Sequence, residues 1–209
     1  MIEKLVNGDH LKRLDNIVQW LEQDGFNKES VSEHSFKVAV FTRAILEDIF
    51  GNNNDEGVLR FKLDCVTHAL HHDFDEAIFL RDISHDIKYN KFNGEEIRHV
   101  IDDYVKHKFD EDFGDESTDC YRMMYNSIVE VPMHIKPVVK LADWLALFYH
   151  CKREVALGNE RFMETLVYCR KSIKESVENV IGSINAVFGR DFLADYLSNF
   201  RRKIYNIVK

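Results

Sequence analysis

Four side chains of this sequence have the residue types and the order of a metal site. His34 comes first, His72 and Asp73 are adjacent, and Asp143 follows much later in the chain. One helix offers too few directions to surround an ion, so the ligands of a helical protein come from several helices. Imidazole nitrogens and carboxylate oxygens together suit divalent transition metals. The sequence therefore predicts one divalent cation held by these four residues.

Each of these residues also has a purely structural interpretation. A single histidine on an apolar helix face, such as His34, also fits a core residue that donates to a backbone carbonyl. Asp143 also fits a carboxylate paired with Lys140. Of the two His-Asp pairs, His72-Asp73 and His85-Asp86, the first ends an apolar helical stripe, where an unpaired charge is costly. One cation would satisfy the inward-facing groups together, and this favours the metal interpretation with His72-Asp73.

The elements that must position these ligands are predicted to be helices. The 209 residues include only 2 prolines and 9 glycines, which leaves little turn chemistry for a many-stranded sheet. Apolar residues from Leu11 to Leu21 recur at helical spacing, and Gly25 then predicts a stop. The chain is therefore predicted to be all-α, and its length fits a single domain over residues 1–209.

Two further helices are predicted to bring the histidines to the site. Ser30 and Glu33 have the spacing of a capping box at the start of a helix. The apolar face of that helix is made of His34, Val38, Phe41, Ile45 and Ile49. After a polar loop, the stripe that ends at His72-Asp73 is made of Leu59, Leu63, Val66 and Leu70.

The rest of the chain is also predicted to be mostly helical. Apolar residues predict helices over 97–105 and 120–129, with an acidic loop from Asp110 to Asp119 between them. Pro137 fits the first position of a helix that contains Asp143. Residues 160–207 predict two long C-terminal helices, so the metal core is expected over about residues 20–150.

Composition argues against several classes of function. The formal net charge of -8 opposes binding to nucleic acid, which depends on clustered lysine and arginine. No segment resembles a signal peptide or a membrane span, so we expect a cytoplasmic protein with no membrane partner. The four cysteines are far apart without a C-x-x-C pair, and we interpret them as reduced core residues.

The order of the predicted ligands, and the residues around them, resemble a known family. His34, His72-Asp73 and Asp143 in Lys140-Leu141-Ala142-Asp143 are arranged as in the HD-domain superfamily. The matching runs are Ser32-Glu33-His34-Ser35, His72-Asp73-Phe74-Asp75-Glu76, and Asp82 with Ile87-Lys88-Tyr89. These runs are similar to bacterial 5'-deoxynucleotidases and to small phage-type deoxynucleoside triphosphate hydrolases. The resemblance covers roughly Trp20 to Asp143 and implies an HD-domain helical bundle.

The resemblance also implies roles for residues around the metal. Glu76 would assist proton transfer, and Asp82 would share this role by protonating the leaving oxygen. Trp20 would pack on the sugar and Lys88 would contact the phosphate, while Gln19 lies in the substrate site where the family usually has an arginine. Without the resemblance, Glu76 is equally a surface carboxylate, Lys88 a solvated side chain and Trp20 an apolar helix residue.

The resemblance implies a phosphohydrolase that acts on deoxyribonucleotides with one divalent metal ion. Co²⁺ or Mn²⁺ is expected first, with Zn²⁺, Ni²⁺, Fe²⁺ or Mg²⁺ as alternatives. The expected reaction releases inorganic phosphate from a deoxynucleoside 5'-monophosphate. Gln19 lacks the charge of a bidentate phosphate donor, although Lys12, Arg13 or Arg81 could compensate. Release of triphosphate from a deoxynucleoside triphosphate such as dATP is therefore one alternative, and a non-catalytic HD-fold binding protein is another. Self-association as a dimer or larger assembly is also expected.

Overall fold

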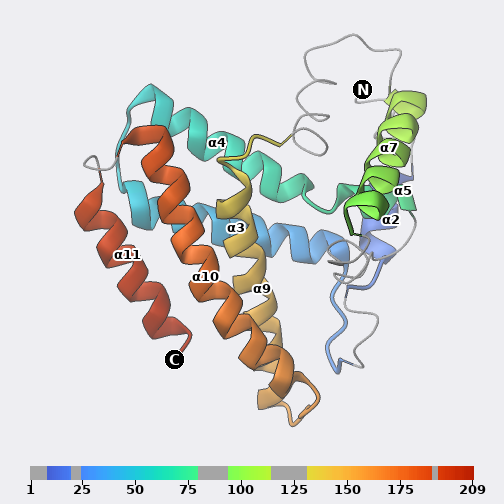
Figure 1. Cartoon of the computed structure of the whole chain (residues 1–209). Coiled ribbons are helices and arrows are strands. Elements are labelled where there is room, and N and C mark those ends of the chain that lie inside the picture. Colours follow the sequence, from blue (N-terminus) through green and yellow to red (C-terminus); the bar gives the residue numbers. More distant parts are fainter. Residues whose placement is uncertain (1–8, 20–24, 80–93, 114–130, 190–192) are drawn as a thin grey trace. The chain divides into compact units, whose positions relative to one another are not determined.

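The computed structural model describes residues 9–19, 25–79, 94–113, 131–189 and 193–209, a part of the chain that is mostly helical (Figure 1). In chain order the helices are α2 His10–Asn16, α3 Val31–Phe50, α4 Glu56–His71, α5 Phe74–Phe79, α7 Gly94–Phe113, α9 Lys136–Ala156, α10 Phe162–Phe188 and α11 Ala194–Ile207. The prediction of an all-α fold is therefore confirmed.

The chain divides into two compact units. The first contains Met1–Asp24, Lys28–Ser35 and His71–Val131, and the second contains Gly25–Asn27, Phe36–Leu70 and Pro132–Lys209. Helices α2, α5 and α7 therefore belong to the first unit, while most of α3 and α4 belongs to the second with α9, α10 and α11. The predictions of a single domain and of a metal core over about residues 20–150 stay predictions.

In the first unit, α2 packs against α5, and α5 contacts α7. The rings of His10 and Phe74 lie 6.0 Å apart, and both side chains are buried. The Arg13 guanidinium also reaches α5, because its Nη1 lies 3.5 Å from the backbone oxygen of Ala77. These contacts hold the short helix that carries Glu76.

The predicted first helix is longer than the observed one. Helix α2 ends at Asn16, Ile17 has extended backbone, and Val18 pairs with Ser30 in an isolated antiparallel bridge. The prediction of a helix through Leu21 is therefore wrong from Ile17 to Gln19. Ile17 and Val18 are β-branched, and such side chains fit extended backbone better than a helix.

In the second unit, α9 and α10 pack side by side, and α11 contacts α10 (Figure 1). Trp144 lies edge-on to Tyr168, and His150 lies edge-on to Phe162, with 5.5 Å between the ring centroids in each pair. Pro137 is in the first turn of α9, as predicted. Helices α10 and α11 confirm the two predicted C-terminal helices.

The buried face of α4 differs from the predicted one. Its buried residues are Val58, Phe61, Cys65 and Ala69, whereas Leu59, Leu63 and Leu70 are exposed. The predicted stripe is therefore wrong. Both sets recur at helical spacing, and the buried set includes Phe61, whose ring packs edge to face against Phe50 and Phe188. The aromatic contact, and not the number of leucines, decides which face is buried.

Two predictions in the middle of the chain have different outcomes. The helix predicted over 97–105 is confirmed as α7, but α7 continues to Phe113, so the predicted acidic loop is wrong from Asp110 to Phe113. Asp110 and Glu111 lie on an exposed part of this helix, where Glu111 pairs with His107 and Lys108. The helix predicted over 120–129 lies outside the described residues.

The three described cysteines, Cys65, Cys151 and Cys169, are buried free thiols. Burial raises the pKa of Cys65. A hydrogen bond with Cys151, together with burial, raises the pKa of Cys169. The thiols of Cys65 and Cys169 therefore stay protonated at neutral pH, and the burial of all three cysteines agrees with the prediction of reduced core residues.

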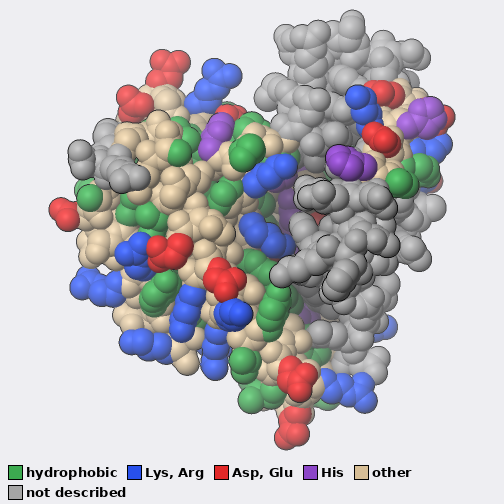
Figure 2. Space-filling model, in the orientation of Figure 1, with side chains coloured by type: hydrophobic (Ala, Val, Ile, Leu, Met, Phe, Trp, Pro, Cys, Tyr) green, Lys and Arg blue, Asp and Glu red, His purple; other side chains and the backbone are tan. Residues whose placement is uncertain are grey.

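The surface over α10 and α11 carries charges of both signs. Figure 2 shows Lys and Arg side chains interspersed with Asp and Glu side chains on this face. Some of them are paired, as Arg201 is with Glu178 and Lys203 is with Asp48 across 2.6 Å. This face therefore has no continuous basic stripe of the kind that binds nucleic acid. Among the described helices, none combines the length and the apolar character of a membrane span.

Glu154 holds a turn of the second unit in place. Its carboxylate is 0% exposed and accepts hydrogen bonds from the backbone N–H groups of Phe26 and Asn27 at 2.7 and 2.8 Å. The side-chain amides of Asn27 and Asn159 each donate to it at 2.9 Å. Burial raises the pKa of Glu154, but these hydrogen bonds outweigh it and bring the pKa to about 2. Four donors thus fix an ionised carboxylate at the carboxyl end of α9.

We expect Glu154→Gln to destabilise the fold by about 2–4 kcal/mol, because an amide leaves two of the four donors without an acceptor. Urea unfolding measures this change, and Glu160→Gln on the exposed turn nearby is the control, expected within about 0.5 kcal/mol of the wild type.

The same carboxylate predicts a pH dependence. Its folded-state pKa of about 2 lies below the ordinary value of 4.5, so its contribution is complete above pH 4.5 and is lost as the pH falls towards 2. Glu154→Gln should lose less stability than the wild type across that window. Equal acid sensitivity of the two proteins would contradict this account.

Candidate metal centre

The first turn of α3 places His34. The Ser30 hydroxyl oxygen accepts a hydrogen bond from the Glu33 N–H at 3.2 Å, and the Glu33 carboxylate accepts one from the Ser30 N–H at 2.9 Å. The predicted capping box is therefore confirmed. His34 follows directly, its N–H donates to the Ser30 carbonyl at 2.9 Å, and its side chain is 1% exposed. The local sequence thus directs an imidazole into the interior of the first unit.

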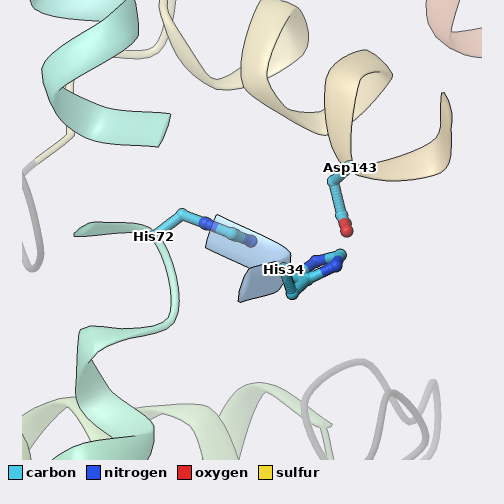
Figure 3. Close-up of side chains that lie close together, drawn as sticks. All are labelled: His34, His72 and Asp143. Atoms are coloured by element: carbon cyan, nitrogen blue, oxygen red, sulfur yellow. The ribbon is translucent and has the colours of Figure 1, made fainter. Parts of the chain in front are cut away.

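His72 and Asp73 lie in the turn between α4, which ends at His71, and α5, which begins at Phe74. Oδ2 of Asp73 lies 3.1 Å from Nε2 of His72 and 3.9 Å from Nε2 of His34. The two imidazole rings have their centroids 5.4 Å apart, and Figure 3 shows them together. The first unit therefore brings three of the four predicted ligands together.

Glu76 and Gln19 lie beside these ligands. Glu76 is in the first turn of α5 and is 1% exposed, so its interpretation as a surface carboxylate is wrong. Nε2 of Gln19 donates to Oδ2 of Asp73 at 3.3 Å and to Oε2 of Glu76 at 3.2 Å. One neutral amide thus links a predicted metal ligand to the predicted proton-transfer residue.

Asp143 belongs to the second unit. It lies on α9, as predicted, and Figure 3 also labels it. Its Oδ2 lies 2.7 Å from Nζ of Lys140, so the ion pair considered from the sequence is present. Nζ of Lys140 also lies 4.9 Å from the ring centroid of Trp144. The Asp143 side chain is 17% exposed, and its role as a ligand stays a prediction.

Glu29 is a buried carboxylate beside His34 that no motif of the sequence indicated. Glu29 is 4% exposed, and its Oε1 lies 3.4 Å from Nδ1 of His34. The available signal was its position directly before the capping box, but an acidic residue at that point also fits an exposed helix start. The other predicted site residues, Trp20, Asp82 and Lys88, lie outside the described residues.

The donor set fits a divalent transition metal. Two imidazoles and one carboxylate meet within the first unit in largely buried surroundings. Nitrogen and oxygen donors of this kind suit manganese, iron, cobalt, nickel or zinc. Burial also lowers the pKa of the adjacent His71, so that imidazole stays neutral at neutral pH and adds no competing positive charge.

Comparison with known proteins identifies the family of this chain. The family model for YfbR-like 5'-deoxynucleotidases matches residues 8–196. The chain belongs to this family. A 5'-deoxynucleotidase of Pectobacterium atrosepticum is 30% identical over 157 residues, which are 73% of this chain and 74% of the relative. One from Erwinia tasmaniensis is 26% identical over 173 residues, which are 79% and 81% of the two chains.

Solved structures support the fold of this family member. An HD-domain phosphohydrolase from Listeria innocua has a TM-score of 0.59 and 18% sequence identity, with 99% of each chain covered. A protein from Pyrococcus horikoshii has a TM-score of 0.57 and 20% identity, with 100% of each chain covered. The predicted resemblance to 5'-deoxynucleotidases is therefore confirmed by the family model, and the predicted fold is confirmed by its similarity to an HD-domain phosphohydrolase.

We expect His72→Ala to lower metal affinity by more than about 100-fold. Loss of a residue that only supports a ligand costs roughly 10- to 100-fold, and this substitution removes a direct ligand. Competition with a chelator measures the affinity for Zn²⁺. His107→Ala, on a side chain that is 71% exposed, is the control. Equal affinities of the two variants would exclude His72 as a ligand.

Proposed function

We propose that this chain is a metal-dependent phosphohydrolase that releases inorganic phosphate from a deoxynucleoside 5'-monophosphate. The observation that carries the proposal is the meeting of His34, His72 and Asp73 within the first unit, with the buried carboxylate of Glu76 beside them. Membership of the YfbR-like 5'-deoxynucleotidase family supports the substrate class. The names of the curated relatives agree with it.

The proposed metal ligands are His34, His72 and Asp73 from the first unit, with Asp143 as the fourth. Its position on α9 supports this role, because the Asp143 side chain is only 17% exposed and its carboxylate is paired with Lys140. When bound, a divalent cation polarises a phosphoryl oxygen and lowers the pKa of water towards neutrality. Co²⁺ or Mn²⁺ remains the expected metal.

Glu76 is the proposed proton acceptor for the attacking water. Its carboxylate is removed from bulk solvent and is oriented by the Gln19 amide, so it is held in one place before substrate arrives. Asp82 is the proposed donor of a proton to the leaving oxygen of the sugar. Such a pair divides the reaction into proton removal from the nucleophile and proton delivery to the leaving group.

The proposed substrate site contains Gln19, Trp20 and Lys88. Trp20 would pack on the deoxyribose, where its bulk excludes a ribose 2'-hydroxyl, and Lys88 would contact the phosphate. The Gln19 amide already donates to Asp73 and Glu76, which makes it a neutral edge of this site and not a charged phosphate donor.

A second source of positive charge lies on α2. Lys12 and Arg13 line a hollow of about 290 Å³ together with Asp9, Asn16 and Ile17. Arg13 also contacts the Ala77 carbonyl, one residue after Glu76. We propose that Arg13 supplies part of the phosphate-binding charge that Gln19 lacks. Lys12 is the second candidate in the same hollow, and Arg81, the third, lies outside the described residues.

Two alternatives give different results in the same assay. A deoxynucleoside triphosphate hydrolase would use the same metal site and release triphosphate, for example from dATP. A non-catalytic binding protein of the same fold would release nothing. The buried position of Glu76 argues against the second alternative, because an unused carboxylate next to a metal site carries a desolvation cost.

We expect the wild type with Mn²⁺ or Co²⁺ to release phosphate from deoxynucleoside monophosphates and to leave ribonucleotides nearly intact. Glu76→Gln should lower kcat by about 100- to 10,000-fold, since a positioned acid-base group contributes that much. Glu175→Gln, on a side chain 65% exposed, is the control with unchanged kcat.

The identity of the released product distinguishes the proposed function from the two alternatives. Triphosphate from deoxynucleoside triphosphates would replace the monophosphate proposal with the triphosphohydrolase. The absence of any product from a folded, metal-loaded protein would exclude a nucleotide hydrolase altogether.

The proposal also includes a cytoplasmic location and self-association as a dimer or larger assembly. Exposed apolar side chains on α4, namely Leu59, Leu63 and Leu70, support self-association, because large exposed apolar patches mark interaction surfaces.

A further inference from the structure

A short antiparallel bridge brings two segments of the first unit together beside the metal ligands. The Gln19 N–H donates to the Glu29 carbonyl at 2.8 Å, and the Val31 N–H donates to the Ile17 carbonyl at 2.9 Å. These hydrogen bonds flank the bridge between Val18 and Ser30. The backbone of Glu29 is therefore fixed from both sides, by the bridge and by the capping box that begins at Ser30.

The Glu29 side chain is directed at His34. Oε1 of Glu29 lies 3.4 Å from Nδ1 of His34, while the other nitrogen of the ring, Nε2, faces Oδ2 of Asp73 at 3.9 Å. Glu29 is 4% exposed and His34 is 1% exposed. The imidazole therefore has a buried carboxylate at its Nδ1 edge and the predicted ligand cluster at its Nε2 edge.

This arrangement determines which nitrogen of His34 can bind a metal. A neutral imidazole carries its proton on one nitrogen and offers a lone pair at the other. A carboxylate accepts hydrogen bonds and cannot donate them when ionised, so it favours the tautomer with the proton on Nδ1. The lone pair is then on Nε2, the atom that faces Asp73.

We propose that Glu29 is a positioning residue that fixes the tautomer and the ring orientation of His34 for metal binding. The inference rests on the proposed function, in which His34 is a ligand. Outer-shell carboxylates of this kind raise the basicity of a ligating imidazole and prevent its rotation. Because Glu29 lies outside the ligand set, its effect should appear in metal affinity before it appears in the chemistry.

The test compares Glu29→Leu and Glu29→Gln with Glu33→Gln in the full-length protein. Leucine removes the acceptor, whereas glutamine keeps one oxygen at similar size and has no charge. Glu33 is exposed, and glutamine also serves in a capping box. Glu33→Gln is therefore the control, because it removes a nearby carboxylate but leaves the contact between Glu29 and His34 in place.

Two readouts are used, both with Zn²⁺ because this ion is diamagnetic. Chelator competition should show an affinity loss of about 10- to 100-fold for Glu29→Leu, a smaller loss for Glu29→Gln, and none for Glu33→Gln. NMR of the imidazole nitrogens in the wild type should show His34 protonated at Nδ1 and coordinated through Nε2. In Glu29→Gln the Nδ1 proton should resonate at higher field, because its acceptor is no longer charged.

Two outcomes would overturn the proposal. The first is a Zn²⁺ affinity of Glu29→Leu equal to that of the wild type. The second applies if Glu29→Leu does not fold, and it is an unchanged chemical shift of the His34 Nδ1 proton in Glu29→Gln. Either result would exclude a positioning role for Glu29. This result is distinct from failure of the proposed function, in which the wild type itself binds no Zn²⁺ and His72→Ala changes nothing.

Discussion

The carboxylate of Asp73 is the group around which the first unit is organised. Its Oδ2 lies 3.1 Å from Nε2 of His72, 3.3 Å from the Gln19 amide nitrogen and 3.9 Å from Nε2 of His34. Largely buried charges need compensation, and a carboxylate between two imidazoles finds it in a shared proton or in a cation. A divalent cation satisfies both imidazoles and the carboxylate together, whereas a proton satisfies only one pair.

Each local element contributes one part of this arrangement. The capping box at Ser30 and Glu33 directs His34 inward, and the end of α4 at His71 leaves His72 and Asp73 in a turn. Helix α5 starts immediately afterwards, so its first turn carries Glu76 back towards the ligands. Segments 17–19 and 29–31, which meet at the antiparallel bridge, contribute Gln19 and Glu29, whose side chains contact the predicted ligands. The site therefore depends on where helices begin and end.

The sequence predicted these elements unevenly, and the reasons are physical. A capping box or an early proline is a local chemical signal for the start of a helix. The helix starts near Ser30 and Pro137 were therefore predicted correctly. The buried face of α4 could not be predicted, because both candidate faces are apolar and only the partners of Phe61 decide between them. The bridge at Val18 pairs residues from two segments, and helical spacing in one segment says nothing about such a contact. Glu29 lies beside this bridge, and its position before the capping box fits an exposed helix start equally well, so its burial could not be predicted.

Gln19 is a neutral residue at a position where the resemblance to the family implies an arginine. An amide linking Asp73 and Glu76 keeps both carboxylates in place, yet it brings no positive charge to a phosphate. In the proposed function, the charge of the anionic substrate is then balanced by the metal and by cations elsewhere, of which Lys12 and Arg13 are the described candidates. The proposed function therefore assigns to the metal, and to these cations, the charge that an arginine would otherwise supply.

The most direct test of the central claim is the anomalous scattering of crystals loaded with Zn²⁺. The account predicts one strong peak within about 2.0–2.2 Å of Nε2 of His34, Nε2 of His72, and a carboxylate oxygen of each of Asp73 and Asp143. A peak elsewhere in the molecule, or a peak at the histidines with Asp143 still bound only to Lys140, would contradict the proposed ligand set.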